Sequence, residues 1–141
     1  MTLAERAAEV IELNDAKHTA VVYGDSSRLT VAPDASLEDA TINLACGSIT
    51  IGRGTFCGHR VMLLTGSHKL NGKRDIADQG RDIVIREDVW LASGCIILGP
   101  CTIGDRCVIG AGAVVTKDCE GGWLYAGNPA KKIRLANDAD D

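Results

Sequence analysis

The chain has 141 residues, a formal charge of −4 and 45% hydrophobic residues, with only 4% aromatic residues. This length and apolar content fit one domain with its own core, whereas the acidic balance disfavours nucleic acid and anionic membranes as partners. No stretch approaches the roughly twenty apolar residues of a membrane span, and no charged-then-apolar leader opens the chain, so we expect a cytoplasmic protein without a membrane span.

The first residues predict a short amphipathic helix. Thr2 and Glu5 form a capping-box pair, and four apolar residues share one helical face, namely Leu3, Ala7, Val10 and Ile11. Such a helix covers the end of a repeat structure, whose terminal coil would otherwise offer unpaired strand edges. We therefore assign residues 1–30 to an N-terminal helical cap and interpret His18 as an ordinary surface residue.

A six-residue repeat then dominates the chain. An aliphatic residue recurs at every sixth position from Ile85, and a small residue follows each of them four places later. The aliphatic positions are Ile85, Leu91, Ile97, Ile103, Ile109 and Val115, and the small ones are Val89, Cys95, Cys101, Cys107, Ala113 and Cys119. This period fits neither a helix nor a single alternating strand. It is typical of a parallel β-helix, so we predict an all-β fold with a β-helix domain over residues 31–122.

Six cysteines raise the question of a disulfide or a metal site. Four of them occupy the small-residue slot of the repeat, where a thiol acts as a compact apolar filler. Zinc sites usually contain cysteine pairs two to four residues apart, which are absent here, so we predict packing roles and no metal. If three hexapeptides make one coil, residues eighteen apart stack, and Cys101 lies beneath Cys119 at about one strand spacing, ~4.8 Å. A reducing cytoplasm disfavours a disulfide between them.

The repeat stops between His68 and Ile83. The intervening segment KLNGKRDIADQGRD carries seven charged residues together with Asn71, Gly72 and Gly80, a composition typical of a loop. Long ordered loops are uncommon unless they have a function. We therefore expect the functional site at this protruding loop, residues 69–82.

Three segments around the loop resemble a known family. The chain contains LLTGSH ending at His68, VWLASG beginning at Val89, and IGAGAVVTKDCEGGWLYAGNPAKKIR ending at Arg134. These motifs resemble the hexapeptide-repeat acyltransferases, particularly the maltose and galactoside O-acetyltransferases and the related acetyltransferases of polysaccharide gene clusters. The resemblance implies a left-handed parallel β-helix with triangular coils, assembled as a homotrimer with active sites between subunits. It also implies that residues 123–141 form a C-terminal segment that packs on the coil and contacts coenzyme A.

The activity implied by the resemblance is transfer of an acetyl group from acetyl-CoA to a hydroxyl of a sugar or glycan-like acceptor. By position the general base is His68, although Ser67 stands between the glycine and the histidine where the galactoside enzymes have no intervening residue. A sugar hydroxyl is too weak an acid to ionise before it attacks, so a base within hydrogen-bond reach must take its proton. Neutral imidazole suits this task, and no serine or cysteine nucleophile is then required.

The resemblance assigns further residues to three roles: an oxyanion donor, contacts to the pantetheine arm, and cations for the phosphates of coenzyme A. In that order these residues are Ser93, then Ala111, Thr116 and Lys117, then Lys131 and Arg134. Asn43 and Trp90 are candidates for binding the acceptor, and Trp90 could equally pack between subunits. The expected cosubstrate is acetyl-CoA, with no metal.

Three alternatives stay open. The first is acetyl transfer to the amino group of an amino sugar or its nucleotide derivative. The second is a γ-class carbonic anhydrase, which shares this coil and binds zinc through three histidines, but His18, His59 and His68 do not have its ligand spacing. The third is a noncatalytic β-helix that serves as an assembly or binding module.

Overall fold

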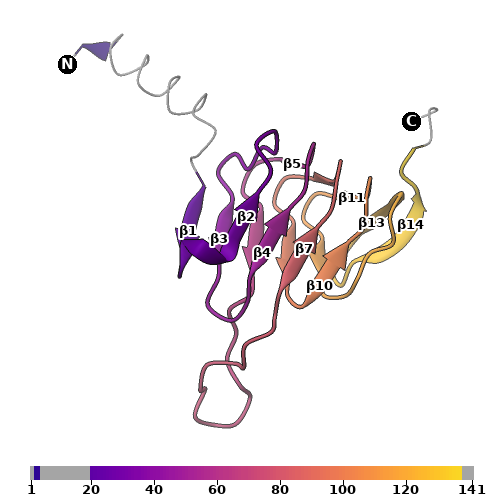
Figure 1. Cartoon of the computed structure of the whole chain (residues 1–141). Coiled ribbons are helices and arrows are strands. Elements are labelled where there is room, and N and C mark those ends of the chain that lie inside the picture. Colours follow the sequence, from indigo (N-terminus) through magenta and orange to yellow (C-terminus); the bar gives the residue numbers. More distant parts are fainter. Residues whose placement is uncertain (1, 4–19, 138–141) are drawn as a thin grey trace.

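The computed structural model describes residues 2–3 and 20–137. Almost all regular structure in the second range is β-strand (Figure 1), with one short 3-10 helix, η1 (Ser26–Arg28), among these residues. The strands, in chain order, are β1 (Val21–Tyr23), β2 (Leu29–Val31), β3 (Thr41–Asn43), β4 (Ile49–Ile51), β5 (Phe56–Cys57), β6 (Met62–Leu64), β7 (Ile83–Ile85), β8 (Trp90–Leu91), β9 (Ile96–Leu98), β10 (Cys101–Ile103), β11 (Val108–Ile109), β12 (Val114–Val115), β13 (Trp123–Ala126) and β14 (Lys131–Leu135). No helix in these ranges is long and apolar enough to cross a membrane.

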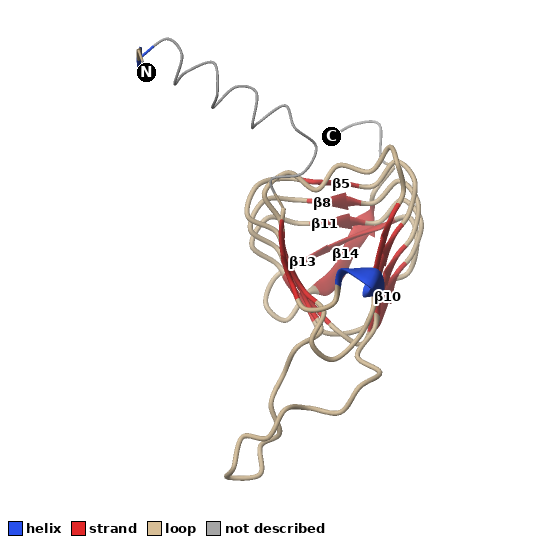
Figure 2. Ribbon diagram, turned by 60° about the vertical axis from the view of Figure 1, so that its left-hand side comes forward, coloured by secondary structure: helices blue, strands red, loops and turns tan. Residues whose placement is uncertain are grey.

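The strands form three sheets that surround one core (Figure 2). The first sheet has the order β1-β3-β6-β9-β12, the second β2-β4-β7-β10, and the third β5-β8-β11-β13-β14. Consecutive strands of the chain belong to different sheets except β13 and β14, which also form the one antiparallel pair among these strands. The chain therefore coils around the core, and the predicted all-β fold with parallel strands is confirmed.

The predicted core is confirmed at every repeat position. All twelve aliphatic and small residues of the hexapeptides from Ile85 to Cys119 are buried, with at most 5% of their surface exposed. Strands one coil apart pair at a spacing of eighteen residues, as Ile83 does with Cys101 and Ile96 with Val114. Inward residues of successive coils therefore stack through the rod, and each buried aliphatic side chain contributes about 1.5–3 kcal/mol to folding.

The predicted stacking of Cys101 beneath Cys119 is wrong. Cys119 instead forms a parallel bridge with Ile103, because the last coil is two residues shorter than the others. The shortened corner is possible because two glycines meet there: a Cβ on Gly104 would lie 2.5 Å from the amide nitrogen of Gly121. The Asp118 side chain then accepts a hydrogen bond of 2.8 Å from the amide of Thr102.

The coil also begins before the predicted boundary at residue 31, because β1 and β2 already pair with β3 and β4. These early coils pair at spacings of twenty or twenty-one residues, as in Leu29 with Ile49 and Thr41 with Met62. Their longer turns hide the six-residue period in the sequence. At the other end of the rod, β13 pairs in parallel with β11, and β14 returns antiparallel to β13.

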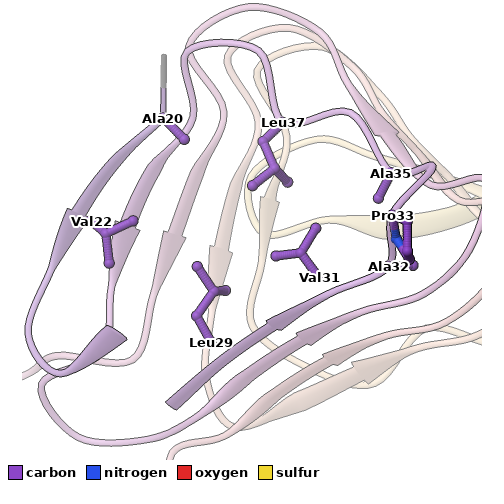
Figure 3. Close-up of a pocket in the computed structure, with 8 residues that line it drawn as sticks. All are labelled: Ala20, Val22, Leu29, Val31, Ala32, Pro33, Ala35 and Leu37. Carbon is purple, nitrogen blue, oxygen red and sulfur yellow. The ribbon is translucent and has the colours of Figure 1, made fainter. Parts of the chain in front are cut away.

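The first coil leaves an apolar hollow of about 370 Å³ at the end of the rod (Figure 3). It is lined by Ala20, Val22, Leu29, Val31, Ala32, Pro33, Ala35 and Leu37. Of the predicted cap over residues 1–30, residues 1 and 4–19, which include His18, lie outside the described residues, whereas residues 20–30 belong to the first coil. Coverage of this hollow by the cap stays a prediction.

All six cysteines are free and buried. Burial raises the pKa of the thiols of Cys57, Cys95, Cys101 and Cys119 to about 12. A thiol with such a pKa is almost entirely protonated at pH 8, and the thiolate is the reactive form.

We therefore expect the folded protein to react very slowly with Ellman's reagent at pH 8, because all six thiols are buried and burial raises the pKa of four of them to about 12. After unfolding in guanidinium chloride, all six thiols should react at the rate of free cysteine. The absorbance of the coloured thiolate that the reagent releases measures the reaction in both states. Fast reaction of several thiols in the folded protein would contradict their role as core residues.

Candidate active site

A long loop is inserted into one coil between β6 and β7 (Figures 1 and 2). Across the insertion Ile49 pairs with Ile83, thirty-four residues further on, whereas the following coil has a spacing of eighteen. The two limbs of the loop hold each other at its base, where the amide of Ala77 donates to the carbonyl of Ser67 at 2.8 Å. The loop therefore leaves and rejoins the coil at one place.

His68 lies in this base, where it forms an antiparallel bridge with Ile76, and its side chain is exposed at the junction of loop and coil. Its Nδ1 is 2.8 Å from the carbonyl oxygen of Arg74. A carbonyl oxygen can only accept a hydrogen bond, so this contact assigns the proton of the neutral ring to Nδ1. The lone pair on Nε2 is then available to accept a proton from a substrate.

A hollow of about 440 Å³ surrounds this histidine. Both limbs of the loop and the turn between β9 and β10 line it, with Ser67, His68, Lys69, Ala77, Asp78, Gln79, Gly80, Arg81 and Pro100. Lys69 and Asp78 form an ion pair across it at 3.1 Å. The predicted base therefore borders a polar hollow of a size that admits a small acceptor.

The coil beneath the hollow is rigid. Thr65 is fully buried, and its hydroxyl donates to the carbonyl of Asn43 and accepts from the amide of Cys46, each at 3.0 Å. The Asn43 side chain packs against Gly66, where a Cβ would come within 2.6 Å of its amide oxygen. The structure thus brings the predicted residue Asn43 to the turn that leads into His68.

The other predicted residues divide between two edges of the rod. The loop edge consists of the turns that follow β6, β9 and β12, and it carries His68, Thr116 and Lys117. The Ser93 edge consists of the turns that follow β5, β8 and β11, and it carries Ser93 and Ala111. Within one chain, the predicted base and the predicted oxyanion donor therefore do not meet.

Ser93 is exposed in its turn. Its hydroxyl oxygen accepts a hydrogen bond of 3.0 Å from the amide of His59, and its carbonyl accepts one of 3.0 Å from Gly112. A hydroxyl that accepts one bond keeps its own hydrogen to donate. Ser93 can therefore offer a donor to a ligand that lies along its edge.

Trp90 lies apart from the hollow at His68, on the outer face of the third sheet. Its ring stacks on Phe56 with the centroids 6.0 Å apart, and both side chains are about half exposed. Trp90 and Arg134 line a separate hollow of about 170 Å³, together with Val108, Leu124 and Ala136. The structure thus places Trp90 with one predicted cation, not with His68 and Asn43.

The predicted cations Lys131 and Arg134 lie on β14 and are exposed. Between them in sequence, Lys132 is occupied by an ion pair with Glu120 and lies 4.0 Å from the centroid of the Trp123 ring. The bond to Glu120 raises the pKa of Lys132. Lys131, which is exposed on the same strand, is therefore a better candidate than Lys132 for binding a phosphate.

Two residues of the loop have structural roles that the sequence analysis did not predict. Gln79 accepts a hydrogen bond of 2.6 Å from Arg28 and donates one of 3.0 Å to the carbonyl of Ala45. Arg81 donates from Nε to the carbonyl of Thr65 at 3.2 Å. Their only signal in the sequence is their position, as polar residues of the last loop segment before the repeat resumes.

In the described ranges, no three histidine, cysteine, aspartate or glutamate side chains come together as a metal-binding group. His59 lies on the Ser93 edge and His68 on the loop edge. The two histidines of the described residues therefore do not share a site within one chain.

The repeat and the three parallel sheets are the features in which the chain resembles the hexapeptide-repeat transferases. Residues 82–117 match the family described as bacterial transferase hexapeptide (six repeats). The chain is 35% identical to the galactoside O-acetyltransferase of Escherichia coli strain K12 over 97 residues, which are 66% of this chain and 47% of that protein. The resemblance seen in the motifs is thereby confirmed.

Other relatives have different acceptors in their names. The chain is 51% identical to a chloramphenicol acetyltransferase of Agrobacterium fabrum over 59 residues, which are 42% of this chain and 28% of that protein. It is 36% identical to a 2,3,4,5-tetrahydropyridine-2,6-dicarboxylate N-acetyltransferase of Staphylococcus aureus over 59 residues, 42% of this chain and 25% of that protein. The matched part of the chain spans less than half the length of each of these relatives.

Among solved structures, a hexapeptide-repeat-containing acetyltransferase from Vibrio cholerae complexed with acetyl-CoA is similar over nearly the whole chain. The TM-score is 0.61 at 26% sequence identity, and the match covers 98% of this chain and 80% of that one. The likeness therefore extends beyond the residues of the repeat.

Proposed function

We propose that the protein is an acetyl-CoA-dependent O-acetyltransferase that acts on a hydroxyl of a sugar or glycan-like acceptor. The observation that carries the proposal is His68, whose Nδ1 is held by the carbonyl of Arg74 beside an acceptor-sized hollow. The acetyltransferase relatives and the complex of the Vibrio cholerae protein with acetyl-CoA support the choice of donor.

The proposed reaction proceeds by direct attack in a ternary complex. Nε2 of His68 removes the proton of the acceptor hydroxyl as its oxygen adds to the thioester carbonyl carbon. The oxyanion that develops accepts a hydrogen bond from Ser93, which stabilises charge present only in the transition state. Collapse of the intermediate breaks the carbon–sulfur bond, and the imidazolium returns its proton to the departing thiolate.

The separation of the two edges supports an assembled form. We propose that the chain winds as a left-handed β-helix with triangular coils and forms a cytoplasmic homotrimer, in which the loop edge of one subunit faces the Ser93 edge of the next. That arrangement would unite His68 with Ser93 and Ala111 in one groove. Coenzyme A would lie along it, with Thr116 and Lys117 against the pantetheine arm and Lys131 and Arg134 near the phosphates.

Acetylation of an amino group is the second candidate. It is favoured by the similarity to the N-acetyltransferase of Staphylococcus aureus. The same imidazole could remove a proton from an attacking amine, so the acceptor atom depends on the residues around the hollow and not on the base.

The proposed activity predicts that mixing the protein, acetyl-CoA and a panel of sugars and nucleotide sugars releases free coenzyme A thiol. Acetyl-CoA at a hundred times its dissociation constant should also stabilise the fold by about 2.7 kcal/mol, measured as a thermal shift. Hydroxylamine cleaves an ester product and leaves an amide intact, which separates the two acceptor types. Absence of both thiol release and thermal shift would favour a noncatalytic module, and stoichiometric zinc with carbon dioxide hydration would favour the carbonic anhydrase.

A further inference from the structure

Arg81 is a cation of the hollow at His68 whose charge is not compensated by the protein. It is partly buried on the limb of the loop that returns to β7, and it lines the same hollow as His68. Its amide donates to the carbonyl of Cys46 at 3.0 Å and its Nε to the carbonyl of Thr65 at 3.2 Å. Across residues 20–137, no hydrogen bond or ion pair is formed by its two terminal nitrogens.

The coil itself fixes the position of Arg81. Thr65, which holds Nε, is fully buried and is itself hydrogen-bonded to the coil. The turn between β9 and β10 packs directly on the backbone of Arg81, because a Cβ on Gly99 would come within 2.0 Å of its carbonyl oxygen. The guanidinium is therefore held in place before any ligand binds.

The remaining charges of the hollow balance each other. Asp78, the carboxylate among its lining residues, is paired with Lys69 at 3.1 Å. Asp82, the residue after Arg81, accepts a hydrogen bond of 2.9 Å from the amide of Ser48 on the coil. Among the residues that line the hollow, Arg81 thus leaves an excess of one positive charge beside the predicted base.

We propose that Arg81 binds a carboxylate of the acceptor while His68 takes the proton of its hydroxyl, so that the acceptor is an acidic sugar. The inference rests on the proposed function and names its substrate class. Two parallel hydrogen bonds from the terminal nitrogens of a guanidinium match the two oxygens of a carboxylate. Because Nε is already bonded to the carbonyl of Thr65, the two terminal nitrogens remain available to a ligand in the hollow.

The first test measures binding without chemistry. Isothermal titration of the full chain with galacturonate and with galactose, at one ionic strength, should show at least about tenfold tighter binding of the acid, as expected for a charge-assisted pair. Arg81→Gln should abolish this preference and leave galactose binding unchanged. Arg81→Lys should keep only part of the preference for the acid, because lysine retains the positive charge but lacks the two terminal nitrogens that bind both carboxylate oxygens.

The matched control is Lys73→Gln, which removes an exposed cation of the same loop that does not line the hollow. This variant should retain the full preference for the acid. Equal binding of galacturonate and galactose by the wild type, or equal loss in the Arg81 and Lys73 variants, would overturn the proposal. Tighter binding of galactose 6-phosphate than of galacturonate would overturn the assignment of the anion as a carboxylate.

The second test follows turnover with the same pair of acceptors. Arg81→Gln should lower kcat/KM for galacturonate about ten- to hundredfold, mainly through KM, and leave the value for galactose unchanged. An equal loss for both acceptors would assign Arg81 to the folding of the loop and overturn the proposal. If no acceptor releases thiol, the proposed function fails, and the binding test still decides whether Arg81 recognises a carboxylate.

Discussion

Replacing His68 with alanine is expected to lower kcat by about 10² to 10⁴, the usual contribution of a positioned general base. The loss should fall on the chemical step, because the Nδ1 contact to the Arg74 carbonyl leaves Nε2 as the atom that receives the proton. Steady-state thiol release measures kcat, and a thermal shift with acetyl-CoA should show that donor binding persists.

The matched control for His68 is Arg74→Ala. It removes an exposed side chain of the loop but keeps the backbone carbonyl that holds Nδ1. Turnover of this variant should remain close to that of the wild type. If His68→Ala itself retained activity within about threefold, the assignment of a general base would be wrong, because loss of such a base costs orders of magnitude.

The largest expected effect on stability comes from Ile85→Ala. Ile85 is buried in the second sheet between Ile51 of the coil before it and Ile103 of the coil after it. Truncating an isoleucine in such a site typically costs about 2–5 kcal/mol, because the neighbours cannot close the cavity completely. Denaturation in urea would measure this loss as a lower transition midpoint.

Val84→Ala is the corresponding control in the same strand. The side chain of Val84 points away from the core and is only partly buried, so its truncation should cost much less than that of Ile85. Similar losses in the two variants would contradict the alternation of inward and outward residues along β7.

The sequence predicted the core of the later coils because their geometry repeats without interruption. Each hexapeptide contributes one aliphatic and one small inward residue, so periodicity alone identified both sets of positions, and all are buried. The same regularity caused the error at Cys119, since a period of eighteen cannot anticipate a corner shortened where Gly104 meets Gly121.

The candidate site was predictable only where it follows a motif. His68 was found because the repeat stops beside it and because LLTGSH resembles a family segment. Gln79 and Arg81 could not be found in this way, since their partners Ala45 and Thr65 lie 34 and 16 positions away and meet them only after the loop has returned. The division of the site between two edges likewise depends on which turns follow which sheet, a property of the coil that no single segment contains.

Because the base of the loop is closed, the loop could be replaced by another of different length or sequence without disturbing the coil. Ser67 and Ala77 hold the two limbs together at 2.8 Å, and Ile49 still pairs with Ile83 as if the insertion were absent. Adding or removing residues between the limbs would therefore change the surroundings of the hollow without shifting the register of any strand, and the entropy of closing a surface loop grows only slowly with its length. A rod built in this way can exchange one loop for another, and so change the molecule it selects, while the remainder of its length stays the same.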